Sequence, residues 1–335
     1  MKRSALHLHS DKHFGILLLI AVVFVFTATA FSLLCGSVSI SLSDIYGALS
    51  HGAKTAGERI FIYSRLPRTL GSLVVGAALA VSGGIIQSCL ANKLASPAVI
   101  GVNSGAGLAV TICAVFGIYG GWQLSLFSFL GASVAVGIIS LSSLGRRMTK
   151  STVILMGVAL NSVLSAISDA LIQFFPDIAV MNADFRIGDL SAVSFKKLVP
   201  SSVAVIFCLL LLFILSNELD ILGFGDEIAT GLGLNTRFYR ALFLILSALL
   251  AGCAVSIAGL VSFVGLMVPH AVRRLGVLRS RRLLPLCALF GAALVTLCDT
   301  AARSLFSPYE IPVGIILAFV GAPCFVIILV NRKER

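Results

Sequence analysis

Charged residues are scarce in this chain of 335 residues, where Asp, Glu, Lys and Arg together make up only 12%. A typical soluble domain carries about 25% charged residues. Hydrophobic residues account for 58%, and the mean hydropathy is +1.06. A soluble fold of this length cannot bury that much apolar surface, and a disordered chain would be far more polar. The composition therefore excludes both classes and indicates an integral membrane protein.

Sequence motifs of enzymes and metal sites are also missing. The chain has no C-x-x-C, H-E-x-x-H or G-x-S-x-G sequence, and GRRMTKS at 145–151 lacks the second glycine of a phosphate-binding loop. We therefore expect no enzyme activity, no metal site and no cofactor held by this chain. The eight cysteines fall within or at the ends of apolar runs, which predicts packing roles in place of disulfides. They are Cys35, Cys89, Cys113, Cys208, Cys253, Cys287, Cys298 and Cys324.

Long apolar runs are abundant, and a helix needs about 20 apolar residues to cross a bilayer. The runs predict an all-α, polytopic membrane protein with ten spans. The first run resembles a signal peptide at Ala28-Thr29-Ala30, but its length favours a retained span. The eighth run is the weakest, because it is short and contains Pro269. The predicted spans are 14–36, 69–90, 98–119, 122–144, 151–175, 198–216, 239–258, 260–275, 283–306 and 311–331.

Glycine is abundant, with 31 residues, and many are four positions apart, as at Gly101 and Gly105 or at Gly117 and Gly121. In a membrane no hydrophobic effect drives helices together, so small residues at this spacing let helix backbones approach closely. We therefore expect most of the glycines to pack helices against one another.

The net charge of +11 does not indicate nucleic-acid binding, because the basic residues lie mainly in short gaps between spans. Cytoplasmic loops of membrane proteins carry an excess of Lys and Arg. Most of the 25 basic residues fall inside when the N-terminus is cytoplasmic, which predicts that both termini lie in the cytoplasm. The basic residues left outside are Lys54, Arg59, Arg65, Arg68, Arg186, Lys196, Lys197 and Arg303.

A polar stripe occurs inside the fifth span, where ionisable groups are costly and often functional. Asn161, Ser165 and Asp169 are four residues apart and so share one helix face. Ser162 lies beside them. The stripe predicts either a water-lined translocation path or hydrogen bonds between helices, and the sequence does not separate the two.

The segment 217–237 (NELDILGFGDEIATGLGLNTR) is too polar to cross a bilayer, yet it is organised. Asp226 and Glu227 precede apolar residues, as acids do in the first turn of a helix. Gly231 and Gly233 would end that helix, and the Asn-Thr pair that follows would cap the next one. The pattern predicts two short helices with a tight bend. Four acids within a basic cytoplasmic face favour docking to another protein.

Five blocks of sequence occur in a fixed order among the predicted spans. They are RLPRTLGSLVVGAALAVSGGIIQ (65–87), NKLASPAVIGVNSGAG (92–107), LGFGDEIATGLGLN (222–235), GLVSFVGLMVPHAVRRL (259–275) and RRLLPLCALFGAALVTLCDTAARSLFSPYEIPVGIILAFVGAPCFVIIL (281–329). Together they resemble the FecCD-type permease subunits of ATP-binding-cassette (ABC) importers. The resemblance extends from about residue 60 to the C-terminus.

Two stretches depart from the family pattern. Leu260 and Val261 stand where many relatives carry Pro-Ile. FRIGDLSAVS (185–194) replaces the usual FWxxGSL stretch and adds Arg186 and Asp189 near the external mouth. These two residues face either the substrate or the solvent in a surface loop, and the loop is favoured.

The resemblance implies a single transmembrane permease domain over residues 1–335, in the lipid of a bacterial cell membrane. It implies three partners: a second permease subunit, identical or different; an ATPase dimer, which holds ATP and magnesium; and an external or periplasmic binding protein. The segment 217–237 resembles the family's coupling loop, and its implied coupling residues are Gly225, Asp226, Glu227, Ala229, Gly231 and Gly233. Arg65, Arg68 and Arg303 resemble arginines that meet acidic residues of the binding protein.

The cargo that the family implies is a ferric siderophore, with haem or cobalamin as alternatives. An ion-coupled secondary transporter, a different class, would use Asp169 and Asp299 as proton or sodium sites. Asp299 also lies four residues before Arg303, which favours a local salt bridge. A membrane-embedded enzyme is disfavoured, because no set of residues has the composition of a catalytic site.

Overall fold

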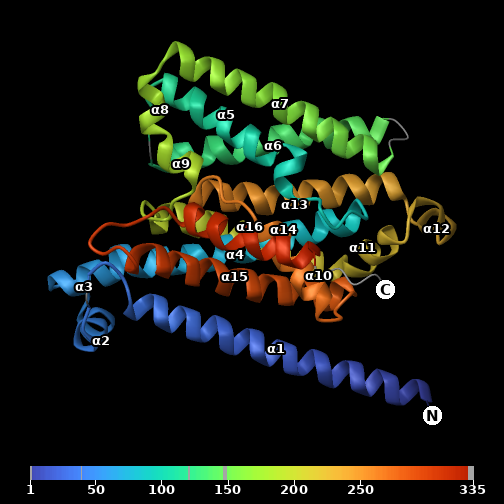
Figure 1. Cartoon of the computed structure of the whole chain (residues 1–335), viewed down its shortest axis with the longest axis horizontal. Coiled ribbons are helices and arrows are strands. Elements are labelled where there is room, and N and C mark those ends of the chain that lie inside the picture. The colour runs from blue at the N-terminus through green and yellow to red at the C-terminus, as the bar shows by residue number, and fades with distance from the viewer. Residues whose placement is uncertain (1, 39, 120, 146–148, 331–335) are drawn as a thin grey trace.

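The computed structural model describes residues 2–38, 40–119, 121–145 and 149–330, and within these ranges it is almost entirely helical and has no strand (Figure 1). The predicted all-α class is confirmed. The longer helices are α1 (Lys2–Leu34), α4 (Leu66–Cys89), α5 (Val102–Val115), α6 (Gly121–Gly145), α7 (Lys150–Phe174), α10 (Phe195–Ile214), α13 (Thr236–Ala258), α14 (Val264–Arg274), α15 (Ser280–Ser304) and α16 (Val313–Val330). The short elements are α2 (Leu42–His51), α3 (Ala56–Ile60), the π-helical turn η1 (Phe61–Arg65), the 3₁₀ turn η2 (Pro97–Ile100), α8 (Asp177–Met181), α9 (Ala183–Ile187), α11 (Ser216–Gly223) and α12 (Asp226–Gly231).

Each predicted span contains a helix, and seven helices of the described chain are long and apolar enough to cross a membrane. The helices α5 and α16 are apolar but shorter. The helix α14 has only 11 residues, which at 1.5 Å per residue is about 16 Å, half of a ~30 Å hydrocarbon core. The prediction that 260–275 crosses as one helix is therefore wrong. Instead, α14 packs between α4, α15 and α16.

The junction between α13 and α14 forms backbone hydrogen bonds with α9 and the segment that follows it. The Leu260 N–H donates to the Phe185 carbonyl at 2.8 Å, and the Asp189 N–H donates to the Ala258 carbonyl at 2.9 Å. A break in a helix is tolerated at membrane depth where neighbouring protein satisfies the freed backbone groups. The two stretches that depart from the family pattern, 185–194 and 260–261, thus lie against each other.

The bundle has a buried centre and an exposed periphery. The helices α4, α13 and α15 form the centre, and 83% of the most apolar stretch of α13 is buried. The helix α7 lies at the edge of the bundle, where only 17% of the corresponding stretch is buried (Figure 1). The exposed helices present apolar side chains, as lipid contact requires, so a polar side chain on them stands out.

Glycine packs the central helices closely, as the sequence predicted. A Cβ on Gly76 of α4 would lie 2.2 Å from the Gly291 carbonyl oxygen of α15, so no side chain fits there. Gly105 of α5 meets α6 in the same way. Gly117 and Gly121 have positive φ and no neighbour within 4 Å, because Gly117 lies in the connection between α5 and α6 and Gly121 is the first residue of α6. The prediction that these two pack helices is wrong.

All eight cysteines are free, and all but Cys35 and Cys324 are buried. Their predicted role as packing residues agrees with this burial. Across the part of the chain that the structure describes, no group of three His, Cys, Asp or Glu side chains is arranged to hold a metal ion.

The first helix is part of the bundle. It packs along α15, and Ala21, Ala28 and Ser32 of α1 are buried, which agrees with a retained span. The N-terminal end of α1, the C-terminal end of α16 and α12 lie toward one end of the bundle, and α2, α3, α8 and α9 lie at the other (Figure 1). Several residues that contributed to the predicted orientation lie outside the described residues: Arg146, Arg147, Arg332, Lys333 and Arg335.

Candidate functional site

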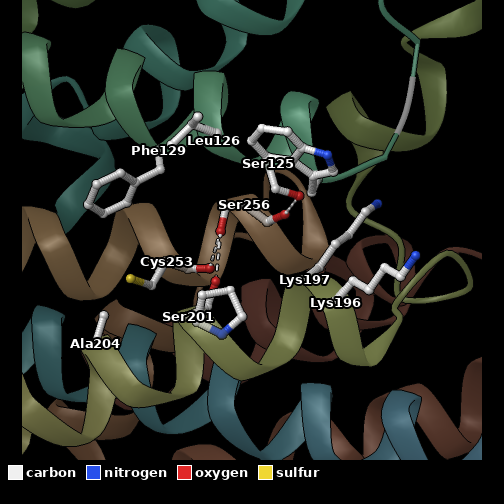
Figure 2. A pocket seen from close by; sticks show the side chains of 11 residues that line it. Ser125, Leu126, Phe129, Lys196, Lys197, Ser201, Ala204, Cys253 and Ser256 are labelled. Carbon is white, nitrogen blue, oxygen red and sulfur yellow. Dashed lines mark hydrogen bonds between the residues drawn. The ribbon is translucent and has the colours of Figure 1, made fainter.

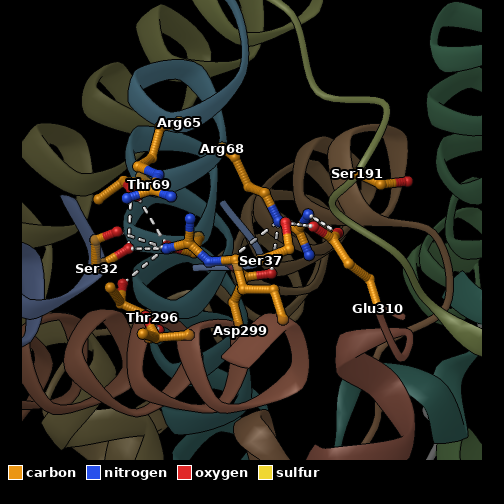
Figure 3. A network of polar contacts seen from close by, with 12 residues as sticks. Ser32, Ser37, Arg65, Arg68, Thr69, Ser191, Thr296, Asp299 and Glu310 are labelled. Carbon is orange, nitrogen blue, oxygen red and sulfur yellow. Dashed lines mark hydrogen bonds and ion pairs between the residues drawn. The ribbon is translucent and has the colours of Figure 1, made fainter. Parts of the chain in front are cut away.

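Three arginines gather at the end of the bundle that carries α2 and α3 (Figures 1 and 3). The turn η1 and the start of α4 supply Arg65 and Arg68, and the last turn of α15 supplies Arg303. Their exposed fractions are 4%, 4% and 3%. Because an unpaired charge is very costly inside a protein, each guanidinium group needs a partner within the chain.

Asp299 of α15 is the acid at the centre of this cluster (Figure 3). Arg68 Nε lies 2.9 Å from Asp299 Oδ1, and Arg303 Nε lies 3.4 Å from Oδ2. Arg68 Nη1 also lies 2.5 Å from Oε2 of Glu310. The predicted salt bridge between Asp299 and Arg303 is confirmed. The contribution of Arg68 was not predicted, because local spacing carries no signal for a partner 231 positions away.

The other contacts of the cluster hold the C-terminal end of α1. Arg65 Nη1 donates to the carbonyls of Leu33 and Leu34 at 3.2 and 2.9 Å. Arg303 Nη2 donates to the carbonyl and the hydroxyl of Ser32 at 2.7 and 2.6 Å. The last carbonyls of a helix lack partners within it, and positive charge is favourable there. Two arginines therefore cap α1 from inside the protein.

Glu310 closes the cluster from the loop between α15 and α16. Its Oε1 accepts a hydrogen bond of 2.7 Å from the Ser37 hydroxyl. Burial alone would raise the pKa of Glu310, but the hydrogen bonds from Ser37 and Arg68 outweigh burial and hold that pKa below its ordinary value. Arg68 and Arg303 thus pair with Asp299, Arg68 also pairs with Glu310, and Arg65 has backbone carbonyls as its partners. The three arginines outnumber the two acids, so these five residues keep an excess of positive charge.

The polar stripe of α7 divides into two parts. Asn161 donates to the carbonyls of Ala98 and Val99 at 2.9 and 3.1 Å, so it joins α7 to η2. Ser165 and Asp169 are exposed, and so is Ser162. At about 100° per residue, Asp169 lies about 80° around the helix from Asn161, which explains the split. Hydrogen bonding between helices accounts for Asn161, whereas the exposed part of the stripe keeps its predicted role as a path lining.

Arg186 of α9 is the partner of Asp169. Its Nη2 lies 3.4 Å from Asp169 Oδ1, and both side chains are largely exposed. The pair places the end of the α7 stripe next to α8 and α9. The backbone N–H of Ser191 donates to Asp189 Oδ1 at 3.2 Å, so Asp189 closes a local turn. The favoured interpretation of 185–194 as a surface loop agrees with these contacts.

The two short helices predicted in 217–237 are present as α11 and α12. Gly225 separates them with φ of +111°, and Gly233 follows α12 with φ of +83°. Both angles are costly for residues with a side chain. Asn235 accepts a hydrogen bond from the Phe238 N–H at 3.2 Å and caps α13. The predicted bend and cap are therefore confirmed.

Apolar side chains on this loop point away from the bundle. Phe224, Ile228 and Leu232 are 69%, 56% and 66% exposed. Ala229 is fully buried and fixes α12 against the rest of the chain. Phe224, Ile228 and Leu232 form what we call the loop patch. Exposed apolar groups rimmed by polar residues are typical of interaction sites.

The acids of α12 differ from each other. Asp226 forms an ion pair with Arg240 of α13, which is buried. Glu227 is exposed and has no ion-pair partner among the described residues. A Cβ on Gly231 would meet open space, so this glycine packs against nothing in the chain. The predicted coupling residues thus comprise an internal anchor, formed by Asp226 and Ala229, and an outward face that includes Glu227 and Gly231.

A cavity of about 380 Å³ between α6, α10 and α13 was not predicted (Figure 2). Ser125 donates to the Ser256 carbonyl at 2.7 Å in its wall, and the apolar part of the wall includes Phe129. Lys196 and Lys197 extend along one side of it (Figure 2). No residue of the α7 stripe lines the cavity. The sequence placed both lysines outside but gave no sign that they share a cavity.

Comparison with known proteins gives the same family throughout. Residues 19–331 match the model of the FecCD transport family. The chain is 33% identical over 320 residues to the Fe(3+)-citrate import system permease protein YfmD of Bacillus subtilis (strain 168). The matched residues cover 94% of this chain and 93% of that protein. It is 31% identical over 299 residues to the vitamin B12 import system permease protein BtuC of Yersinia pseudotuberculosis serotype O:1b (strain IP 31758). The matched residues cover 88% of this chain and 89% of that protein.

The fold is also similar to that of a solved ABC transporter of the metal-chelate type in an inward-facing conformation. The TM-score is 0.82 and the sequence identity is 29%. The similarity covers 95% of this chain and 99% of the solved one. The helical bundle therefore has a counterpart in a solved transporter over 95% of the chain.

Proposed function

Because the chain belongs to the FecCD transport family and is an ABC importer permease, we propose that it carries a ferric siderophore that an external binding protein delivers. The similarity to an Fe(3+)-citrate permease supports an iron complex as cargo. The similarity to a vitamin B12 permease makes cobalamin the second candidate, ahead of haem. We place the protein in a bacterial cell membrane, with both termini on the cytoplasmic side together with α12.

The observation that carries the transport path is the exposed polar face of α7. Ser162, Ser165 and Asp169 point outward from a span that is otherwise apolar. Contact between a carboxylate and lipid is costly. A second permease subunit that faces α7 across a water-filled path removes this cost. The path in this proposal lies between two permease subunits, and Asn161 holds α7 in place at its edge.

The loop patch supports coupling to a separate ATPase dimer, which would hold ATP and magnesium. Its three apolar side chains are exposed, and α12 lies at the end of the bundle (Figure 1). A groove on the ATPase would bury them, and Glu227 would lie at the rim of that contact. The ion pair between Asp226 and Arg240 then transmits movement of α12 to α13.

The arginine cluster supports docking of the binding protein at the opposite end. Burial leaves Arg65, Arg68 and Arg303 little surface for direct contact. Their excess positive charge still attracts acidic groups, because the field of a charge extends beyond its own surface. In this proposal the arginines hold α1 and Glu310 in place and add a positive field, and neighbouring exposed groups make the contact.

An ion-coupled transporter is the second candidate class, and the cluster argues against it. Asp299 is fully buried between Arg68 and Arg303, so a proton or sodium ion would have to displace a guanidinium group. Asp169 already pairs with Arg186 near α9. Asp299 therefore has no accessible oxygen for an ion, and Asp169 binds Arg186 through Oδ1.

Uptake by proteoliposomes tests the proposed function. The permease would be reconstituted with a candidate ATPase and binding protein from the same genome, and a ferric siderophore, haem and cobalamin would be supplied outside. We expect uptake of the ferric siderophore that requires ATP inside the vesicles and no ion gradient. Uptake driven by a proton or sodium gradient without ATP would overturn the importer proposal. ATP-driven uptake of cobalamin or haem alone would overturn only the cargo.

A further inference from the structure

An apolar groove of about 350 Å³ lies on the outer surface between α10, α15 and α4. Leu210 and Phe213 line it and are 63% and 48% exposed, so they face away from the bundle. Leu284, Pro285 and Ala288 of α15 form the opposite wall. Both α10 and α15 are long enough to span a membrane. The groove is thus an indentation in the lipid-facing surface, parallel to two spans.

One end of the groove is basic. Arg281 lies in the first turn of α15, and its guanidinium carbon is 5.3 Å from the centre of the Phe213 ring. Arg282, the next residue, lies over Phe14 of α1 and so points to another side of α15. The start of a helix carries partial positive charge, and basic residues are unfavourable there. Arg281 is held against the groove despite this repulsion.

Two polar groups at this end of the groove have no hydrogen-bond or ion-pair partner among the described residues. Asp220 of α11 accepts the Ser280 N–H at 2.9 and 3.2 Å and caps α15. The Ser280 hydroxyl also lines the groove. This side chain is 1% exposed, and its oxygen has no hydrogen-bond partner among the described residues. Arg281 has no ion-pair partner in the described chain. An unpaired buried hydroxyl and an uncompensated guanidinium group therefore face one apolar groove.

We infer that this groove binds an anionic phospholipid, with one acyl chain between α10 and α15 and the phosphate between Arg281 and the Ser280 hydroxyl. The chain spans a membrane, so lipid is the molecule that this surface meets. Basic pockets between spans are known sites for anionic headgroups. The apolar wall accounts for the acyl chain, and Arg281 selects the charge. A zwitterionic phospholipid fills the groove equally well but gains less from Arg281.

Native mass spectrometry of the full chain, purified in detergent and stripped of lipid, measures this selectivity. Phosphatidylglycerol and phosphatidylcholine with identical acyl chains would be titrated separately. We expect one tight site that prefers phosphatidylglycerol. The variant Arg281→Gln should weaken phosphatidylglycerol binding about fivefold and leave phosphatidylcholine unchanged, and Arg281→Lys should restore most of the preference. The matched control Arg59→Gln makes the same charge change at the opposite end and should bind as the wild type does.

Equal affinity of the wild-type chain for the two lipids would overturn the inference. Equal losses in Arg281→Gln and Arg59→Gln would do so too, because they would show a net-charge effect. Should Arg281→Gln fail to fold, the wall variant Ala288→Phe provides the test. This change narrows the groove without changing its charge and should weaken the binding of both lipids to the same extent.

The occupant in the cell is identified by a photoreactive benzoylphenylalanine at Leu210. Irradiation of intact membranes should attach a mass that corresponds to an anionic phospholipid. A cross-linked pair of permease chains, or an adduct with another protein, would show that protein covers the groove and would overturn the lipid assignment. This readout does not depend on the identity of the transported cargo.

Discussion

The arginine cluster and the loop patch lie at opposite ends of the bundle. The family resemblance assigned the three arginines to docking, and it assigned the segment 217–237, which contains the loop patch, to docking as well. The two regions differ in how far their side chains are buried. Arg68 is 4% exposed and pairs with two acids of its own chain. Ile228 is 56% exposed, and its apolar surface is left without cover. The arginines have ion-pair or hydrogen-bond partners within the chain, whereas the apolar side chains of the loop patch are left exposed.

This difference shows that charge at a membrane surface does not by itself identify a docking site. Buried arginines stabilise the subunit that contains them, so changing them tests folding first. Reversing Arg68 to glutamate would place a carboxylate against Asp299 and would disrupt the bundle before any effect on docking could be seen. An exposed apolar patch does not contribute to the folding stability of the isolated subunit, so changing it tests assembly. Variants in the two regions should therefore separate stability from association.

The largest expected effect is on stability, in Asp299→Ala. Removing this acid leaves Arg68 and Arg303 buried without their shared partner. Breaking a buried ion pair from one side costs about 3–5 kcal/mol. We expect a large fall in the thermal unfolding temperature of the purified permease. Asp169→Ala removes an exposed pair, worth about 0.2–1 kcal/mol, and serves as the control. Equal stability of the two variants would contradict the structural role of the cluster.

The next effect is on assembly, in Leu232→Asp. This change places a charge in the loop patch, and central residues of an interface contribute about 2 kcal/mol or more, which is about thirtyfold in affinity. We expect loss of ATPase binding in a pull-down and an unchanged unfolding temperature. Leu278→Asp is the matched control, because Leu278 is 71% exposed but lies outside the patch. Normal ATPase binding by Leu232→Asp would remove the loop patch from the interface.

The adjacent acids of α12 repeat the comparison on a smaller scale. Asp226→Asn removes the ion pair with buried Arg240 and should cost about 1 kcal/mol of stability. Glu227→Lys changes an exposed group and should leave the unfolding temperature unchanged. We expect Glu227→Lys to slow binding of the ATPase more than Asp226→Asn does, because rim charges govern association rates. Stopped-flow binding and thermal unfolding of both variants would measure this. A reversed order in either assay would mean that α12 directs Glu227 toward the bundle and Asp226 away from it.

Local patterns predicted much of this fold. Apolar runs located every long helix, because burial in lipid requires a continuous stretch of apolar residues. The acid and glycine pattern located α11 and α12. The helix α2 was missed, although Ser41 and Asp44 form a capping box whose spacing is readable in the sequence. The break before α14 was also missed, because the carbonyl of Phe185 that satisfies it lies in a distant segment.

The site was less predictable than the fold, because its partners are far apart in sequence. The polar stripe gave the correct helix, but each step of four residues turns about 40° past a full turn, so Asn161 lies about 80° from Asp169 and away from the exposed face. The arginines were identified from the family resemblance, yet nothing local showed that Arg65 and Arg303 would cap α1. The spacing of residues in the sequence reveals interaction partners one helical turn apart, whereas partners distant in the sequence are brought together only by tertiary packing.

The smallest expected effect is a pH dependence that belongs to the arginine cluster alone. The pKa of Glu310 is held below its ordinary value in the folded chain. The folded state therefore binds this proton less readily than the unfolded state does. The resulting stability is fully present above the unfolded pKa of about 4.3 and is lost as the pH falls through the folded pKa. Thermal unfolding between pH 3 and 6 should show a steeper fall for the wild type than for Glu310→Gln. Leu232→Asp should follow the wild type, because the loop patch does not contact the cluster. Parallel curves for Glu310→Gln and the wild type would show that this carboxylate does not stabilise the external end.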